Sequence, residues 1–179
     1  MAKPSSQQIE ELTRLREFVI EVMMAMEVWS EEELTKLNVI DLGVLRKNAT
    51  QRHGVTRWKR GVKNPTKPEQ VDVIDLHPRL LTKDWIPYGA WVLHHEFVHA
   101  LGYTAHDSTF RSLEKLWPSQ ESSTMGLDFT EMLRREKAKW LWVCDTCKKE
   151  YPRQKPGKGR YLCRKCRTIL KDVPNDTVQ

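Results

Sequence analysis

The strongest constraint on the fold is a set of four cysteines near the C-terminus. They form two Cys-x-x-Cys pairs, Cys144/Cys147 and Cys163/Cys166, separated by fifteen residues. This spacing is typical of a zinc ribbon, in which each pair forms a knuckle and a hairpin through residues 156–159 brings the knuckles together. Four thiolates complete the coordination of one Zn²⁺, so this ion is expected to be structural. Disulfide bonds are the alternative, and a reducing compartment disfavours them.

Two features that the sequence lacks, a secretory signal and a membrane span, indicate where in the cell the protein is located. The N-terminal segment lacks the apolar stretch of a secretory signal. No apolar run approaches the ~20 residues of a membrane span. We therefore expect no membrane partner and a cytoplasmic location, associated with the nucleoid, or a nuclear one in a eukaryote.

A second metal-binding pattern, His95-Glu96-Phe97-Val98-His99, lies in a mostly apolar segment that predicts a buried helix over 84–101. Two histidines four residues apart on a helix project from one face and can reach the same ion. Glu96 is then placed to act as general base on a zinc-bound water without binding the ion itself. Gly102 is a natural end for this helix. The pattern predicts a catalytic Zn²⁺, the second zinc of the chain.

A third ligand is expected soon after the helix. His106 follows His95 by eleven residues, one more than in the related pattern H-E-x-x-H-x-x-G-x-x-H, and a loop can absorb the difference. The alternatives are His94, His77 and Glu114. A helix turns by 100° per residue, which disfavours His94. His53 and His77 are expected to be structural or to face the substrate.

The remaining pattern predicts an α+β fold. Helices are expected from Ser5 or Ser6 to about Trp29, from Ser30, over 39–47, from Asp107 or Ser108 to Trp117, and over 130–142. Strands are expected over 55–58 and 71–76, paired as a hairpin. The predicted domains are a metallopeptidase domain over 1–142, a zinc ribbon over 143–171 and a flexible tail over 172–179.

The positive charge is concentrated at the C-terminal end. Residues 131–171 contain 14 Lys and Arg against 4 Asp and Glu, a net charge of +10, whereas the whole chain carries +6. The rest of the chain is therefore net negative, which indicates a polyanionic partner for the ribbon. Basic side chains interleaved with Tyr151 and Tyr161 favour single-stranded or distorted DNA, although both tyrosines could instead form the ribbon core. The candidate DNA-contacting residues are Lys148, Lys149, Arg153, Lys155, Lys158, Arg160, Tyr161, Arg164, Lys165 and Arg167.

Several segments together resemble the SprT-like (SprT/Spartan) family of zinc metallopeptidases. They are, in order, Gly54-Val-Thr-Arg-Trp58, His77-Pro-Arg-Leu-Leu81, the segment His95–His99, His106-Asp-Ser-Thr-Phe110 and the Cys₄ ribbon. The His-x-x-x-Phe element is also similar to WLM-type and YgjP-type metallopeptidases, but the ribbon favours SprT. The resemblance covers roughly residues 10–170. It implies a minimal zincin fold with helices packed on a small antiparallel sheet, followed by the Cys₄ ribbon.

The same resemblance implies the activity and the roles of the site residues. The family cleaves proteins crosslinked to DNA, a DNA-repair function. His95, His99 and His106 would be zinc ligands and Glu96 the catalytic acid/base. The expected function is thus a DNA-associated zinc metalloendopeptidase. The alternatives are a nucleic-acid-binding zinc protein with little or no catalysis, and a zinc hydrolase of non-peptide substrates. Retention of Glu96 favours an enzyme, and a strand edge at 71–76 favours a peptide substrate.

Overall fold

The computed structural model describes residues 3–176 and divides the chain into two compact units, with the boundary between Met125 and Gly126. The boundary was expected after residue 142, seventeen residues later. The segment between the two positions forms a helix that packs against a strand of the second unit. Both units contain helices or strands around their own small sheet, and the α+β class is therefore confirmed. No helix within residues 3–176 is long and apolar enough to span a membrane.

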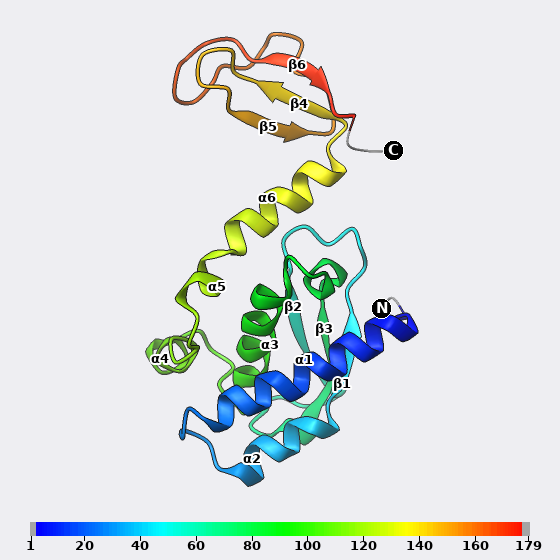
Figure 1. Cartoon of the computed structure of the whole chain (residues 1–179), viewed down its shortest axis with the longest axis vertical. Coiled ribbons are helices and arrows are strands. Elements are labelled where there is room, and N and C mark those ends of the chain that lie inside the picture. The colour runs from blue at the N-terminus through cyan, green and yellow to red at the C-terminus, as the bar shows by residue number, and fades with distance from the viewer. Residues whose placement is uncertain (1–2, 177–179) are drawn as a thin grey trace. The chain divides into compact units, whose positions relative to one another are not determined.

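The first unit holds helices around a three-stranded sheet (Figure 1). Its elements are α1 (Ser6–Met24), α2 (Glu31–Thr35), β1 (Asp41–Val44), β2 (Gly54–Trp58), β3 (Val71–Leu76), α3 (Ile86–Ala100), α4 (Ser108–Glu114) and α5 (Gln120–Thr124), with 3₁₀ turns at Lys36–Val39, Pro68–Gln70 and Pro78–Leu81. The sheet order is β1-β3-β2. The predicted hairpin of β2 with β3 is confirmed, since the two strands pair antiparallel.

One predicted helix is wrong. The segment 39–47 was expected to be helical, but it contains β1, which pairs in parallel with β3. The sheet is consequently mixed and not purely antiparallel. Gly43 faces Asp75 across this pair, and the Asp75 carboxylate occupies the space that a Cβ atom at Gly43 would need. Strand β1 therefore forms through its pairing with β3, a long-range contact that no helix or strand pattern within residues 39–47 indicates.

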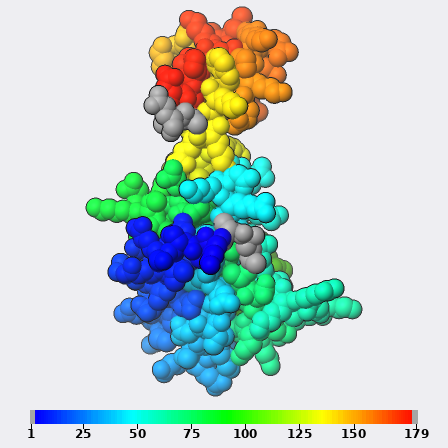
Figure 2. Space-filling model, turned by 90° about the vertical axis from the view of Figure 1, so that its right-hand side faces the viewer, coloured from blue at the N-terminus to red at the C-terminus, as the bar shows by residue number. Residues whose placement is uncertain are grey.

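The helices of the first unit are set by caps and by an apolar face. Ser5 caps α1 in a reciprocal capping box with Gln8, and α1 buries Leu12, Leu15, Val19 and Met23 among its core residues. Helix α1 stops at Met24, five residues before the expected Trp29, and the chain turns at Glu27 with a positive φ of 54°. In the space-filling view, α1 and the segments up to β1, coloured blue to cyan, lie side by side (Figure 2).

The central helix, α3, positions the candidate site. Pro87 lies in its first turn, and most of its side chains are buried against β2, β3 and α1. Gly102 ends it with a φ of +104°, which a residue with a side chain rarely adopts. A Cβ atom there would also lie 3.0 Å from the carbonyl oxygen of Thr66. This glycine stop turns the chain back toward the half-buried histidines of α3, His95 and His99.

The second unit is a helix followed by a small antiparallel sheet. Its elements are α6 (Gly126–Lys137), β4 (Trp140–Val143), β5 (Glu150–Arg153) and β6 (Lys171–Pro174), with strand order β5-β4-β6. The predicted helix over 130–142 thus ends earlier, and its last residues form the central strand. Trp142, Cys144, Cys163 and Leu170 form the core.

The predicted flexible tail from Asp172 is wrong over the residues that the structure describes. Residues 171–174 form β6, and the Asp172 carboxylate accepts hydrogen bonds from the backbone N–H groups of Gly157 (2.6 Å) and Lys158 (2.7 Å). Asn175 is buried and donates to the carbonyl oxygens of Arg135 and Ala138, both at 2.7 Å. This strand is needed to complete the sheet. The last part of the expected tail, 177–179, lies outside the described residues.

Candidate metal centres and cleft

Three imidazoles meet at the partly exposed face of α3. His95 and His99 lie one turn apart on the helix, and His106 approaches them from the segment after Gly102. The Nε2 atom of His106 lies 3.0 Å from Nε2 of His99 and 3.2 Å from Nε2 of His95. Tetrahedral Zn²⁺ with Zn–N bonds of about 2.05 Å separates its nitrogen ligands by roughly 3.3 Å. These three nitrogens could therefore hold one metal ion.

The second ring nitrogen, Nδ1, of each helix histidine lies within hydrogen-bond distance of an acceptor. His95 Nδ1 lies 2.7 Å from Glu114 Oε1, and His99 Nδ1 lies 2.8 Å from the carbonyl oxygen of Tyr103. A carbonyl or carboxylate oxygen can only accept, so each Nδ1 carries the proton and each Nε2 keeps its lone pair. Burial lowers the pKa of His99 to about 4 and also lowers the pKa of His95. Both rings are thus neutral, the form that binds metals.

Phe110 supports all three imidazoles from one side. Its ring centroid lies 4.9, 4.6 and 4.7 Å from the ring centroids of His95, His99 and His106. Phe110 is fully buried on α4, which Asp107 caps by accepting from the Phe110 N–H group at 2.9 Å. The first turn of α4 therefore fixes the apolar floor immediately after His106.

The alternative ligands lie elsewhere. His94 is fully buried between Trp29 and Trp117, with ring-centroid distances of 6.3 and 5.2 Å. His77 is also buried, and its Nδ1 accepts from the Arg79 N–H group at 3.2 Å. His53 pairs with the Tyr88 hydroxyl at 2.7 Å. The third alternative, Glu114, touches the outer nitrogen of His95 and not the side that faces the other imidazoles.

Glu96 lies in the same cleft but its carboxylate is held by the neighbouring strand. Thr56 Oγ1, on β2, donates to Glu96 Oε2 at 2.7 Å. A Cβ atom at Gly54 would lie 2.7 Å from Glu96 Oε1, so the absence of a side chain there makes room for the carboxylate. Burial raises the pKa of Glu96 to about 7, although the Thr56 hydrogen bond opposes the shift. A carboxyl group with such a pKa can both accept and return a proton near neutral pH.

The cleft around these groups has a volume of about 460 Å³. Besides the three histidines and Glu96, its walls are Arg52, Gly54, Val55, Thr56, Trp58 and Thr104. The strand beside it is β2, one of the two edge strands of the sheet, whereas β3 is paired on both sides. The expectation that residues 71–76 offer a free edge is therefore wrong, because β1 covers the second edge of β3. Within the described sheet, β2 provides the strand edge next to the cleft.

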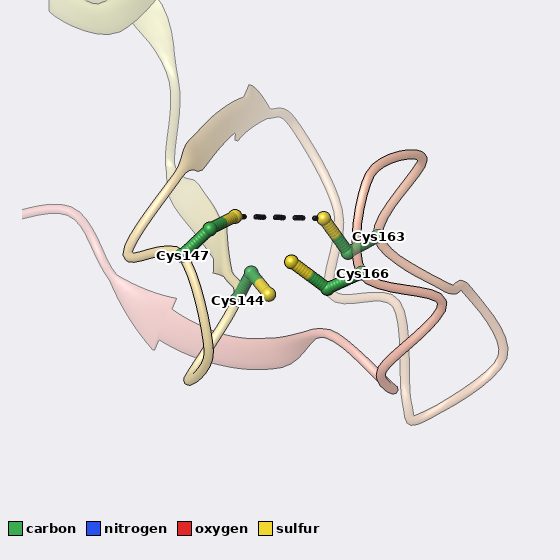
Figure 3. Close-up of side chains that lie close together, drawn as sticks. All are labelled: Cys144, Cys147, Cys163 and Cys166. Atoms are coloured by element: carbon green, nitrogen blue, oxygen red, sulfur yellow. Dashed lines mark hydrogen bonds between the residues drawn. The ribbon is translucent and has the colours of Figure 1, made fainter.

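The second candidate centre is formed by the four cysteines. Their sulfurs point toward one another from two loops (Figure 3). Cys147 Sγ and Cys163 Sγ are 3.7 Å apart, close to the roughly 3.8 Å between thiolates around tetrahedral Zn²⁺ with 2.3 Å bonds. All four thiols are unbridged. The Tyr151 hydroxyl lies 3.5 Å from Cys163 Sγ, and this contact, together with hydrogen bonds from backbone N–H groups, lowers the pKa of that thiol to about 6, which favours the thiolate.

The two Cys-x-x-Cys loops have matching backbone geometry. The N–H groups of Lys148 and Arg167 donate to the carbonyl oxygens of Cys144 (2.8 Å) and Cys163 (2.9 Å). Lys148 and Arg167 each follow the second cysteine of a pair, and both adopt positive φ angles, 57° and 59°. This repeated turn aims both sulfurs of each pair at one centre, as expected for zinc knuckles.

The ribbon surface is basic and carries an aromatic stack. All nine Lys and Arg candidates for DNA contact are exposed, and none forms a salt bridge within residues 3–176. The rings of Trp142 and Tyr161 stack with centroids 4.2 Å apart, and the Arg153 guanidinium lies 4.9 Å over Trp142. Tyr161 remains 46% exposed, so it packs on the core and also presents one face to solvent. Tyr151, in contrast, contacts the cysteine cluster.

Sequence reasoning did not find several residues that shape the site. Thr56 and Gly54 act on Glu96, and Tyr103 contributes only a backbone carbonyl. The contacts of Thr56 and Gly54 with Glu96 join distant segments, which no local spacing marks. The Tyr103 carbonyl lies only four residues after His99, but a backbone group carries no residue-type signal. No protein-family model, curated protein or solved structure matches this chain.

Proposed function

We propose that this protein is a zinc-dependent hydrolase whose substrate is a polypeptide. The observation that carries the proposal is that three imidazole nitrogens converge in the same cleft as a buried carboxyl group. A purely structural site would be expected to close its coordination sphere with a fourth protein ligand, as the cysteine cluster does. Here three ligands face an open cleft, which leaves a position for a reacting group.

In such a site the metal ion and the side chains of the protein supply different parts of the chemistry. Zinc bound at the three histidines would supply Lewis acidity, which polarises a carbonyl group and lowers the pKa of a coordinated water toward ~7. Glu96 would accept the proton of the attacking water at its carboxylate and pass it to the leaving amine. Thr56 keeps Oε2 in a fixed orientation during both transfers. The His95 and His99 rings stay neutral because burial lowers the pKa of both, and the acceptors at Nδ1 leave Nε2 as the unprotonated nitrogen.

The edge of β2 supports a peptide substrate in preference to a small molecule. The backbone of an extended peptide can pair with an exposed strand edge, and β2 lines the cleft through Val55, Thr56 and Trp58. This pairing would lay the peptide across the three histidines. The resemblance of the motifs around residues 54–58, 77–81 and 106–110 to the SprT-like peptidases supports the same conclusion, and also a zincin-type arrangement of the first unit.

DNA association is the second part of the proposal and rests on the second unit. Its nine exposed cations, which form no salt bridge within residues 3–176, would contact phosphates, and the half-exposed ring of Tyr161 offers a face for a base of single-stranded or distorted DNA. The substrates would then be proteins bound or crosslinked to DNA. A non-catalytic DNA-binding zinc protein is the alternative function, favoured by the same cations but not by the buried Glu96.

The test compares the wild-type chain with Glu96→Gln on a protein crosslinked to DNA and on the same protein free in solution. Glu96→Gln should retain two zinc ions but lose hydrolysis by about 10²–10⁴-fold, the usual effect of removing a general acid/base. Glu121→Gln, an exposed carboxylate on α5, is the matched control and should leave the rate unchanged. Hydrolysis by Glu96→Gln within a few-fold of the wild type would exclude the assigned role. Absence of cleavage by the wild type would favour the non-catalytic alternative.

A further inference from the structure

Glu114 is a largely buried carboxylate whose two oxygens have different partners. The side chain is 11% exposed at the end of α4. Oε1 lies 2.7 Å from His95 Nδ1, and Oε2 accepts from the Arg111 guanidinium at 2.7 Å. Burying a carboxylate is costly unless it is paired and hydrogen-bonded. The contacts of Glu114 therefore join it firmly to His95 on one side and to Arg111 on the other.

This contact fixes the orientation of the His95 ring. The imidazole is anchored to α3 through its Cα, and the contact of Glu114 with Nδ1 restricts rotation of the ring about the Cβ–Cγ bond. The Nε2 atom is consequently aimed at the Nε2 atoms of His99 and His106. A carboxylate that accepts the Nδ1 proton also makes the ring a stronger electron donor, because the negative charge stabilises positive charge on the imidazole.

Helix α4 connects this carboxylate to the other parts of the site. His106 precedes the helix, Phe110 supports the three rings, and Glu114 lies at its last residue. His99, by contrast, has only the Tyr103 carbonyl oxygen as its outer partner. Glu114 thus contacts one of the three imidazoles directly with a charged side chain. A substitution can remove this contact, whereas no substitution removes the backbone carbonyl that contacts His99.

We propose that Glu114, held by Arg111, is a positioning residue of the three-histidine centre, which orients His95 and strengthens the binding of a divalent cation. This inference rests on the proposed function, because it concerns zinc at that centre. The structure separates this role from direct ligation, since Glu114 contacts the nitrogen of His95 that points away from His99 and His106.

The experiment measures zinc affinity of the three-histidine centre by competition with a chelator, in the full chain whose ribbon zinc stays bound. The variants are Glu114→Gln and Glu114→Ala, with Glu121→Gln as a charge-matched control outside the site. Removal of an outer partner of a ligating histidine typically weakens metal binding about 10–100-fold, which is the loss expected for Glu114→Ala. Glu114→Gln should lose less, because its amide oxygen can still accept the Nδ1 proton. The control should bind as the wild type does.

Two further readouts distinguish positioning from other roles. Thermal unfolding of the chain holding only the ribbon zinc should shift little in Glu114→Gln, whereas the zinc affinity should fall. Cobalt placed at the three-histidine centre should keep a spectrum of three nitrogen ligands in Glu114→Ala, and loss of one ligand would show direct ligation and overturn the proposal. Equal zinc affinity of wild type and Glu114→Ala would overturn this inference alone. A wild-type chain that binds no second zinc would overturn it together with the proposed function.

Discussion

The hydroxyl of Thr56 donates a 2.7 Å hydrogen bond to the Oε2 atom of Glu96, and this bond joins the edge strand β2 to the helix α3. The same hydroxyl lies 3.2 Å from the backbone carbonyl oxygen of Glu96. Two residues forty positions apart thereby set the direction of the carboxylate in the cleft. Glu96 is buried, with 6% exposure, so its position has little freedom to relax in solvent. The geometry of β2 is therefore part of the candidate catalytic site.

Gly54→Ala should disturb Glu96 directly. The added Cβ would lie 2.7 Å from Glu96 Oε1 and from Val92 Cγ1, closer than such atoms can approach. The carboxylate must then move, and overpacking of this kind typically costs 1–3 kcal/mol. We expect lower hydrolysis with two zinc ions still bound, measured by rate and by metal analysis. Thr56→Ser, which keeps the hydroxyl, is the control. A wild-type rate in Gly54→Ala would show that this contact does not position Glu96.

The pH dependence of stability should reveal the raised pKa of Glu96. A carboxyl whose pKa is about 7 in the folded protein, against an ordinary value of 4.5, is protonated between these pH values in the folded chain but not in the unfolded one. The folded protein therefore loses stability as pH rises from 4.5 to 7. In chains without metal at the three histidines, the free energy of unfolding of Glu96→Gln should increase relative to that of the wild type as pH rises from 4.5 to 7, by at most about 3 kcal/mol. Denaturant unfolding of both proteins at several pH values measures this difference.

Only the difference in the free energy of unfolding between Glu96→Gln and the wild type isolates the contribution of Glu96. His94 and His99 have pKa values lowered to about 4 by burial, so their contribution has the opposite sign. The unfolded chain binds their protons below about pH 6.5, and stability from these two residues rises with pH from 4 to 6.5. The wild-type curve alone would therefore mix both effects. A Glu96→Gln difference that stays constant from pH 4 to 8 would contradict the raised pKa.

His106→Ala should empty one zinc centre and leave the other intact. Its Nε2 atom lies 3.0 and 3.2 Å from those of His99 and His95, so its loss removes one of three ligands. We expect metal analysis to fall from two zinc ions to about one after dialysis. The remaining ion should be the ribbon zinc, which a Cys144→Ser variant would remove instead. Two tightly held zinc ions in His106→Ala would contradict the ligand assignment.

Lys148→Gly and Arg167→Gly should separate stability from DNA affinity. Both residues have positive φ angles, which glycine adopts without steric cost, so stability should be unchanged or rise by up to about 1 kcal/mol. If the two side chains contact phosphates, DNA affinity should fall. The slope of log affinity against log salt should decrease by up to ~0.9 per contact on duplex DNA and ~0.7 on single strands.

The control is Lys63→Gly at an exposed cation of the first unit, which removes one positive charge, as each single variant of this pair does. It should leave DNA affinity unchanged. DNA titrations at several salt concentrations, together with thermal unfolding, provide both readouts. Unchanged affinity and slope in the double variant would remove the knuckle cations from the proposed DNA surface.

Local spacing predicted the parts of each site that come from one segment. His95, Glu96 and His99 share one helix, and the two cysteine pairs each form a tight turn, so their geometry depends on a few backbone angles. His106 was also predicted, because Gly102 ends the helix and leaves a short loop. Its alternatives were excluded only by the fold, which buries His94 between two tryptophans.

The sequence by itself determined which side chains could bind a metal, because a helix repeats every 3.6 residues and a knuckle spans four. Only the tertiary structure decided that 39–47 contains a strand, that β2 is the edge beside the cleft, and that Asp172 closes the ribbon. It also decided the partners of Glu96 and His95, namely Thr56 and Glu114. These contacts join segments distant in the chain, and their formation depends on packing of the whole unit, which no local pattern encodes.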